Sequence, residues 1–430
     1  MPSINLLKLT AGLESTAGSA VSRTAVIPIS GLFNVQRSQE VAADPAIVGA
    51  NMKTGSFLLA DSVGGDIPLT PRPVDGYGRL LVSCLGATDT ATQIGGCLRF
   101  QYTGASASNK VSASASGDTI NSKIGTLGSE ANDSNFGSSG TIDLTAGATD
   151  TLAELVAVIN AYSDYTCEKV FGADSLDVAA IEDITALQGK KTWVYVWFTS
   201  SSTGLYRHNF AVNLTSTERK TLTLQGDGLQ DNYTWDGAVV DTMSFSAALK
   251  GFAEGSCTVM GFDEATGITA SSVTLPTANP LVFHDGSFYL GSTNYTYLRN
   301  LSFEIRNNHN ADGYGQGSTG RQYHEKGLFE VSGDVQLRLD ATSIAERAKI
   351  FANTDIAIAA HFNGAALSAD IDEMLIVEIP YVSLDEWTHS DNAGQVDATV
   401  NWSANNPKGS PYNSPFKMWM INDDSQAYSS

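Results

Sequence analysis

Two stretches of this chain decide its fold: L-S-F-E-I-R at residues 301–306 and F-E-V-S-G-D-V-Q-L-R-L-D at residues 329–340. Apolar and polar residues alternate in both, which is the pattern of a β-strand with one buried and one solvent-exposed face. The apolar positions are therefore expected to point into a core. They are Leu301, Phe303, Ile305, Phe329, Val331, Val335, Leu337 and Leu339.

The segment between these strands, residues 307–326, consists mostly of polar residues and glycine. A loop of this length in a compact domain is usually functional or disordered. We expect it to reach a neighbouring subunit through Asn307, Asn308, Asp312, Gly313, Tyr314, Gly317 and Arg321. Residues 315–320, G-Q-G-S-T-G, formally match a dinucleotide-binding pattern, but no strand directly precedes them and a strand, not a helix, follows. A mobile glycine loop is therefore the favoured interpretation.

The composition predicts a mainly β protein with short helices. The 430 residues are 42% hydrophobic and only 17% charged, and short alternating runs recur along the chain. The formal net charge is −21, from 46 acidic and 25 basic residues, which argues against a surface that grips nucleic acid. Nucleic acid could still slide past such a surface. No run approaches the roughly 18 apolar residues of a membrane span, so no membrane partner is expected.

No pattern in the chain predicts catalysis, a cofactor site or a metal site. The four cysteines form no C-x-x-C pair, so reduced and mostly buried thiols are expected. Residues 226–236 hold three carboxylates and could cradle calcium, but they lack the ligand order of an EF-hand, and a polar turn is favoured. A glycan hydrolase with paired carboxylates is the weakest alternative, with Asp227 and Asp231 as its best candidates.

The sequence pattern of residues 97–204 predicts an inserted small α+β subdomain. Their first part is rich in Ala, Ser, Gly and Asn, and Thr151 with Glu154 forms a capping box that opens a helix. Trp193, Tyr195 and Trp197 alternate on a strong strand. A buried face is favoured for these three aromatic residues over an exposed sugar-binding platform.

Two helices are predicted outside the insertion. The first follows Pro73, and Gly86 offers its C-terminal stop. The second is expected to open at a capping box formed by Ser343 and Glu346. Residues 1–22 are small and polar, which predicts a flexible N-terminal arm without a secretory signal. Residues 401–430 are expected to form a C-terminal extension.

Several segments, taken in their order along the chain, resemble the tail tube proteins of long-tailed (siphovirus-type) bacteriophages. They are G-G-D-I-P-L at residues 64–69, L-L-V-S-C-L-G at 80–86, Y-R-H-N-F at 206–210, T-L-T-L-Q at 221–225, S-F-E-I-R-N-N at 302–308, F-E-V-S-G-D-V-Q-L-R-L at 329–339 and V-E-I-P-Y-V at 377–382. The resemblance implies a discontinuous tail tube β-domain over residues 23–96 and 205–400. The insertion at residues 97–204 does not match the family core.

The resemblance implies a β-sandwich whose strands, including the two quoted first, join those of neighbouring copies in a β-barrel ring. One tube unit per chain favours a hexameric ring, and stacked rings would form the conduit for DNA ejection. DNA would pass a negative lumen without specific binding. The implied partners are copies of the chain and other tail proteins (tape measure, tail terminator and distal tail). The implied location is the virion tail, after synthesis in the cytoplasm of a bacterial host.

One alternative function remains open beside the tail tube. A β-rich adhesin-type protein of the virion surface would use the inserted subdomain for binding. The aromatic stripe at residues 193–197 motivates this alternative.

Overall fold

The computed structural model describes residues 7–43, 56–190, 192–201, 203–215, 219–228, 231–276, 278–351, 356–392, 394–405 and 414–429. Its helices are α1 (Asp75–Leu85), α2 (Leu152–Asn160), α3 (Ala341–Phe351) and the short 3-10 helix η2 (Phe283–Asp285). The strands of the first half are β1 (Lys8–Leu13), β2 (Ala25–Ile27), β3 (Gln36–Ala43), β4 (Ser56–Leu69), β5 (Thr92–Tyr102), β6 (Ser108–Ser114), β7 (Thr119–Gly125), β8 (Ala131–Asn132), β9 (Thr141–Asp143), β10 (Tyr165–Gly172), β11 (Ile184–Gln188), β12 (Val194–Thr199) and β13 (Tyr206–Ala211). Those of the second half are β14 (Leu222–Asp227), β15 (Tyr233–Ala248), β16 (Ala253–Gly261), β17 (Asp263–Thr266), β18 (Gly286–Leu290), β19 (Thr293–Asn294), β20 (Leu298–Arg306), β21 (Glu330–Arg338), β22 (Ile356–Ala366), β23 (Asp372–Asn392), β24 (Gln395–Ala404) and β25 (Lys417–Asn422). The prediction of a mainly β protein with short helices is confirmed.

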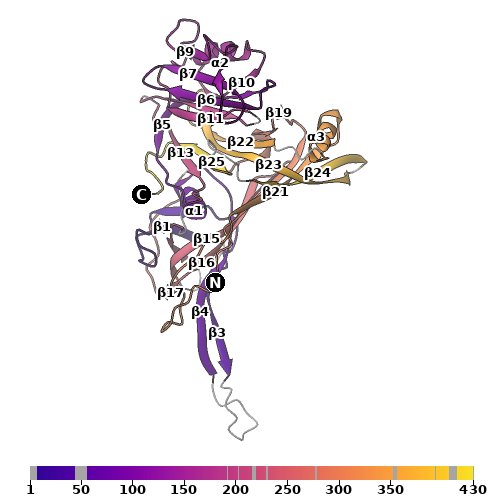
Figure 1. The fold of residues 1–430 in the computed structure, drawn as a ribbon. Coiled ribbons are helices and arrows are strands. Elements are labelled where there is room, and N and C mark those ends of the chain that lie inside the picture. The colour runs from indigo at the N-terminus through magenta and orange to yellow at the C-terminus, as the bar shows by residue number, and fades with distance from the viewer. Residues whose placement is uncertain are drawn as a thin grey trace.

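One long antiparallel sheet runs through the elongated molecule (Figure 1). Its strands follow the order β3–β4–β16–β15–β20–β21–β24–β23. The two stretches that decide the fold are its central pair, with Ile305 of β20 opposite Val331 of β21. Their alternation places every second side chain on the same face of the sheet.

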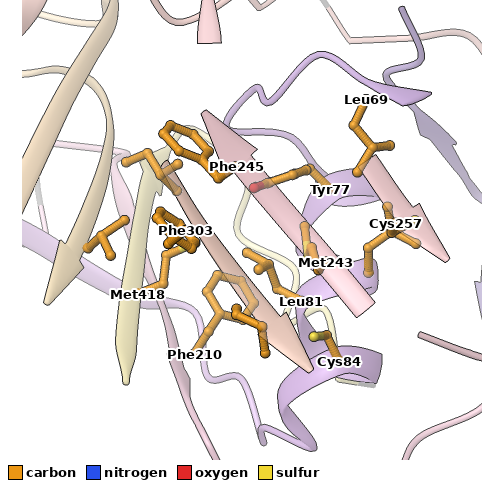
Figure 2. Close-up of a cluster of buried hydrophobic side chains, with 14 of the residues drawn as sticks. Leu69, Tyr77, Leu81, Cys84, Phe210, Met243, Phe245, Cys257, Phe303 and Met418 are labelled. Atoms are coloured by element: carbon orange, nitrogen blue, oxygen red, sulfur yellow. The ribbon is translucent and has the colours of Figure 1, made fainter. Parts of the chain in front are cut away.

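The main core covers one face of this long sheet. Phe245 of β15 and Phe303 of β20 are buried there with ring centroids 5.0 Å apart. Helix α1 packs across β15, and Figure 2 shows its Tyr77 and Leu81 in one cluster with Met243. Because burying one such large side chain is worth about 1.5–3 kcal/mol, this cluster is a major source of the stability of the subunit.

Helix α1 is positioned by two local features. It ends as predicted at Gly86, whose φ of 63° is left-handed and whose N–H donates to Val82 O. Inside the helix, a Cβ added to Gly78 would lie 2.1 Å from the ring of Tyr428. The absence of a side chain at Gly78 therefore allows the C-terminal segment to pack directly on the helix.

Residues 103–190 form a second layered region at the end of the molecule opposite β3 and β4 (Figure 1). A small sheet of β11, β6, β7, β8 and β9 packs with α2 around its own core, which includes Phe136, Leu155 and Val196. The predicted capping box is confirmed, because Thr151 Oγ1 accepts from the N–H of Glu154 and the Glu154 side chain accepts from the N–H of Thr151. Strands β5 and β12 pair with each other and lead into the main sheets.

Both chain ends depart from expectation. Residues 1–6 of the expected arm lie outside the described residues, but residues 8–13 form β1, which pairs with β14 and β2 and buries Leu9. The expectation of a flexible arm is therefore wrong for this segment, because backbone pairing and burial hold it. Within the expected C-terminal extension, β25 lies between β13 and β23.

Helix α3 begins earlier than expected. The N–H of Ser343 donates to Asp340 Oδ1 and the N–H of Asp340 donates to Ser343 Oγ, both at 2.8 Å. Asp340 therefore caps a helix that opens at Ala341, and the expected start at Ser343 is wrong. An aspartate carboxylate accepts the same capping bond that the sequence pattern assigned to serine.

Candidate functional site

The long sheet has an open face opposite the main core. We define it by the polar side chains that alternate with the core residues on seven strands, all of them half-buried or exposed: Asp66, Thr242, Ser244, Ser246, Glu254, Ser256, Thr258, Ser302, Glu304, Arg306, Glu330, Ser332, Asp334, Gln336, Arg338, Glu386, Thr388, Thr399, Asn401 and Ser403. Six are carboxylates and two are arginines. The open face is therefore acidic.

Hydrogen bonds on the open face join side chains of neighbouring strands and, in one case, side chains of the same strand. Thr258 Oγ1 donates to Asp66 at 2.6 Å, and Asn401 Nδ2 donates to Glu386 at 3.0 Å. Arg306 Nη2 donates to Glu304 at 2.6 Å, and this hydrogen bond raises the pKa of the guanidinium. Such bonds satisfy the side chains without a second layer, which suits a surface that faces solvent.

The two outer edges of the long sheet carry unpaired backbone. In the described part of the chain, β3 pairs only with β4, and residues 384–392 of β23 pair only with β24. An unpaired strand edge is a template for pairing with another chain. The long sheet therefore offers one such edge on each side.

A two-stranded ribbon extends from one end of the long sheet. We define it as residues 36–43 of β3 and residues 56–62 of β4; it is the narrow projection in Figure 1. At its base, Arg37 Nε donates to Asp61 Oδ2 at 2.7 Å, and the N–H of Arg37 donates to Glu264 at 3.2 Å. Beyond the base its apolar side chains face solvent: Val41 is 54%, Phe57 58%, Leu58 39% and Leu59 54% exposed.

The expected contact loop at residues 307–326 is anchored at both ends. Asn307 is fully buried; its Nδ2 donates to Cys84 O and Val240 O, and its Oδ1 accepts from Arg219. This residue, a candidate for contact with a neighbouring subunit, is therefore a structural residue of this subunit. The reason is tertiary: its amide fills a polar gap at the end of α1.

Two histidines anchor the rest of the loop. His309 Nδ1 lies 3.0 Å from Asp241 Oδ1; burial opposes ionisation of Asp241, but hydrogen bonds from His309 lower its pKa overall. His324 Nε2 donates to Gly237 O at 2.7 Å, its ring stacks on Phe262, and burial lowers its pKa to about 4. Hydrogen bonds and ring packing therefore hold both segments of the loop to their own subunit.

The middle of the loop lies beside the ribbon. The N–H of Asp61 donates to Thr319 O at 2.7 Å. Of the expected contact residues, Asn308, Asp312 and Gly317 are exposed and Tyr314 is half-buried, whereas Gly313 and Arg321 are buried. The ribbon and the exposed part of the loop thus belong to the same end of the subunit.

A family model described as "Phage tail tube protein" matches residues 5–404. The chain belongs to the phage tail tube protein family. A comparison with curated proteins gave no match. Membership makes the chain a structural component of a phage tail. None of the helices in the described ranges is long and apolar enough to cross a membrane.

In this member of the tail tube family, the side chains of the candidate barrel strands divide between the two faces of the long sheet. Leu301, Phe303, Ile305, Val331, Val335 and Leu337 are buried in the main core, while Phe329 and Leu339 are half-buried just outside the ends of β21. The intervening polar residues occupy the open face. Sequence reasoning singled out the buried half of the pattern, and the same alternation would have identified Ser302 and Asp334 as the surface half.

The aromatic stripe of the tail tube subunit is a packed junction. Trp193, Tyr195 and Trp197 are at most 5% exposed, and Tyr195 packs on Trp419 with ring centroids 4.8 Å apart. The interpretation as a buried face is confirmed. The same burial argues against a sugar-binding platform, because a platform needs a ring face that is free for the ligand.

Arg99 of β5 joins the inserted region to the main β region at this junction. It is fully buried, it donates to Glu168 at 2.8 Å, and its guanidinium carbon lies 3.6 Å from the ring centroid of Tyr289. Arg99 Nη1 also lies 3.1 Å from His361 Nε2. Burial is the main factor that lowers the pKa of His361, and the nearby Arg99 charge adds to it.

The described residues contain no group of three His, Cys, Asp or Glu side chains placed to hold a metal ion. The carboxylates of the possible calcium segment are already engaged. Asp227 Oδ2 accepts from the N–H of Ser271, and Asp231 Oδ2 accepts from the N–H of Gly267. All four cysteines are buried and free, and burial raises the pKa of Cys84 to about 12.

Proposed function

We infer that this protein is the subunit of a phage tail tube and that its copies associate into rings that stack around a channel for DNA. The ring of six follows from the resemblance to tail tube proteins with one tube unit per chain. The open face lines the channel. The subunit has a structural rather than a catalytic role in the virion tail.

The observation that carries this proposal is the acidic open face on a sheet with two free edges. Pairing of the β3 edge of one copy with the β23 edge of its neighbour continues the sheet from copy to copy. Closure into a barrel removes the exposed edges altogether. The six carboxylates then surround the channel. They repel phosphate, so that DNA passes without adhering.

Other features fit a subunit with this arrangement. The region at residues 103–190 lies away from the ribbon and forms a decoration of the ring. Tape measure, terminator and distal tail proteins are the partners that the tail tube family implies. Synthesis in the cytoplasm of a bacterial host, followed by incorporation into the virion, accords with this role.

Electron microscopy of the purified chain tests the assembly. We expect rings and short tubes, with class averages that report the number of copies per ring. Light scattering after size exclusion measures the same number in solution. A protein that stays monomeric at high concentration, alone and with its tail partners, would overturn the proposal.

A charge-reversal experiment tests the position of the open face. The double variant Glu254→Lys, Glu386→Lys places four additional units of positive charge relative to wild type on each copy of the open face. Assembled tubes of this variant should retain short duplex DNA at low salt, with affinity falling steeply as salt rises. The matched control is Asp143→Lys, Asp183→Lys, which makes the same charge change at exposed sites of the inserted region. Equal DNA retention by both variants would show that the open face does not line the channel.

A further inference from the structure

A cleft opens where the inserted region meets the main β region. This junction cleft has a volume of about 300 Å³, and its lining includes Glu182, Trp197, Arg207, Asn209, Glu378 and Lys417. Residues 182–185 and 187 line it from the inserted region, and β13, β23 and β25 line it from the main β region. Figure 1 shows β11 beside β13 and β25 at this boundary. The volume lies at the lower end of the roughly 300–1,000 Å³ of ligand clefts, which suits one small ring.

Paired strands position the side chains that line the cleft from the main β region. Ala211 of β13 lies opposite Lys417 of β25, and Lys417 lies opposite Glu378 of β23. Asn209 and Trp419 form the next row, two residues further along their strands. Residues directly opposite each other, and residues two apart on one strand, share a face of a sheet. Backbone pairing therefore fixes the spacing of these side chains.

Three side chains at the junction cleft keep a buried polar atom without a hydrogen-bond partner among the described residues: Arg207 Nε, Glu182 Oε1 and Asn209 Oδ1. Arg207 is 7% exposed, and its Nη1 donates to Glu182 Oε2 at 2.8 Å. Buried polar groups in proteins are almost always hydrogen-bonded, because an unpaired one is costly. A molecule in the cleft that supplies the missing hydrogen bonds removes this cost.

Glu378 is the most deeply buried acidic group of the lining. It is 2% exposed, and burial raises the pKa of its carboxyl to about 7 against the opposing charges of Lys417 and Arg99. Burial therefore outweighs the attraction of these two cations. Hydrogen-bond donors supplied by a ligand would favour the charged carboxylate.

The mixture of charges decides which kind of ligand fits. Arg207 and Lys417 line the junction cleft as cations. They lie beside the carboxylates of Glu182 and Glu378. The carboxylates repel a bound anion, and the cations repel a bound cation. A hydroxyl group both donates and accepts hydrogen bonds, so a neutral ring with several hydroxyls satisfies both kinds of side chain at once.

We propose that the junction cleft binds a single neutral sugar ring. This inference goes beyond the proposed tube function and does not depend on it. The hydroxyls of the sugar donate to Glu378 and Asn209 Oδ1, and its oxygens accept from Arg207. The aromatic stripe offers no stacking surface, because the guanidinium carbon of Arg207 lies 4.6 Å from the ring centroid of Trp197. Hydrogen bonds, and not stacking on the stripe, therefore hold the sugar.

Saturation-transfer NMR of the purified chain tests for binding, with glucose, galactose, mannose, N-acetylglucosamine and rhamnose as probes. Tryptophan fluorescence gives the affinity, because Trp197 and Trp419 line the cleft. We expect at least one of these sugars to bind saturably. Absence of saturation transfer to all of them would overturn the inference.

Two substitutions test whether the sugar lies in the junction cleft. Glu378→Gln keeps the shape of the side chain and should weaken binding about tenfold, because a hydrogen bond to a neutral amide is weaker than one to a carboxylate. Ala211→Leu fills the cleft from a half-buried position and should abolish binding. The matched control is Glu373→Gln, which changes another buried carboxyl of β23, 5% exposed and outside the lining, and should bind as wild type does.

Urea unfolding midpoints verify that each variant is folded. Asn209→Ala, at a half-buried position, replaces a variant that fails to fold and should also weaken binding. Equal affinity of wild type and the cleft variants would overturn the inference even if a sugar binds. Ring formation is followed in the same samples; its failure in the wild type would contradict the proposed function, whereas the binding measurements alone decide this inference.

Discussion

Replacing Asn307 with alanine should destabilise the isolated subunit, not only its assembly. Four hydrogen bonds would be lost: Oδ1 accepts from Arg219 Nε at 3.1 Å and Nη2 at 2.8 Å, and Nδ2 donates to Cys84 O at 2.8 Å and Val240 O at 3.0 Å. An orphaned buried polar group costs about 1–3 kcal/mol, and groups that share one cavity relax together. We therefore expect the free energy of unfolding to fall by about 3–5 kcal/mol.

The charge of Arg219 makes the expected loss of stability larger than it would be if all the hydrogen-bonded groups were neutral. Arg219 is 6% exposed, and burial lowers the pKa of its guanidinium. The remaining contacts of Nη1 are with Leu85 O at 2.7 Å and Asn213 O at 3.1 Å. Without Asn307, two of its donors face a cavity, and a buried cation tolerates missing hydrogen bonds poorly.

Urea denaturation followed by tryptophan fluorescence measures this effect, because Trp235 and Trp402 are buried in the main core. Asp312→Ala is the control. Asp312 is exposed in the same loop, and surface substitutions of this kind stay within about 0.5 kcal/mol. An Asn307→Ala midpoint equal to that of wild type would refute the argument and restore the interpretation of residues 307–326 as a loosely attached arm.

Three further predictions concern the rest of the subunit. Burial lowers the pKa of His324 to about 4, below its unfolded value of about 6.5, so the stability that its neutral ring contributes is fully present above pH 6.5 and is lost as the pH falls through 4. In urea titrations between pH 7 and pH 4, wild type should therefore lose about 3 kcal/mol more stability than His324→Gln. Parallel loss of stability in the two proteins would contradict this prediction. Gly78→Ala should lower the free energy of unfolding by about 1–3 kcal/mol despite the better helix propensity of alanine, because the new Cβ would lie 2.1 Å from the Tyr428 ring. In the same urea titration, the double variant with Tyr428→Ala should lose less stability than the sum of the losses of the two single variants. Arg99→Met should make the junction between the inserted region and the main β region sensitive to limited proteolysis, while the core of the inserted region stays folded. An unchanged digestion pattern would show that Arg99 does not hold the junction.

The local parts of the fold could be predicted because their signals are local. Alternation with a period of two predicted β20 and β21, Gly86 predicted the end of α1, and the capping box at Thr151 predicted the start of α2. Each signal depends on residues within a few positions of one another. The start of α3 was missed by the same kind of reasoning, because Asp340 competed with Ser343 for the same role.

The candidate site was harder to predict because it depends on where the strands end relative to one another. Residues 57–59 read F-L-L, an apolar run without alternation, which a sequence alone assigns to a core strand. Only the register shows that β16 ends opposite Val63 and leaves the first part of β4 uncovered. Likewise, Asn307 is polar in a polar loop, and its role depends on Arg219 and Val240, far away in the sequence.

The sequence by itself determined the mainly β class, the two faces of the central strand pair and the acidic character of the chain. Those properties follow from composition and from side-chain periodicity, which act over a few residues. Only the tertiary structure decided which polar segment is anchored and which apolar segment is exposed. A side chain is buried or exposed according to what the rest of the chain places beside it, and for Asn307 and Phe57 that outcome is the reverse of what their own polarity suggests.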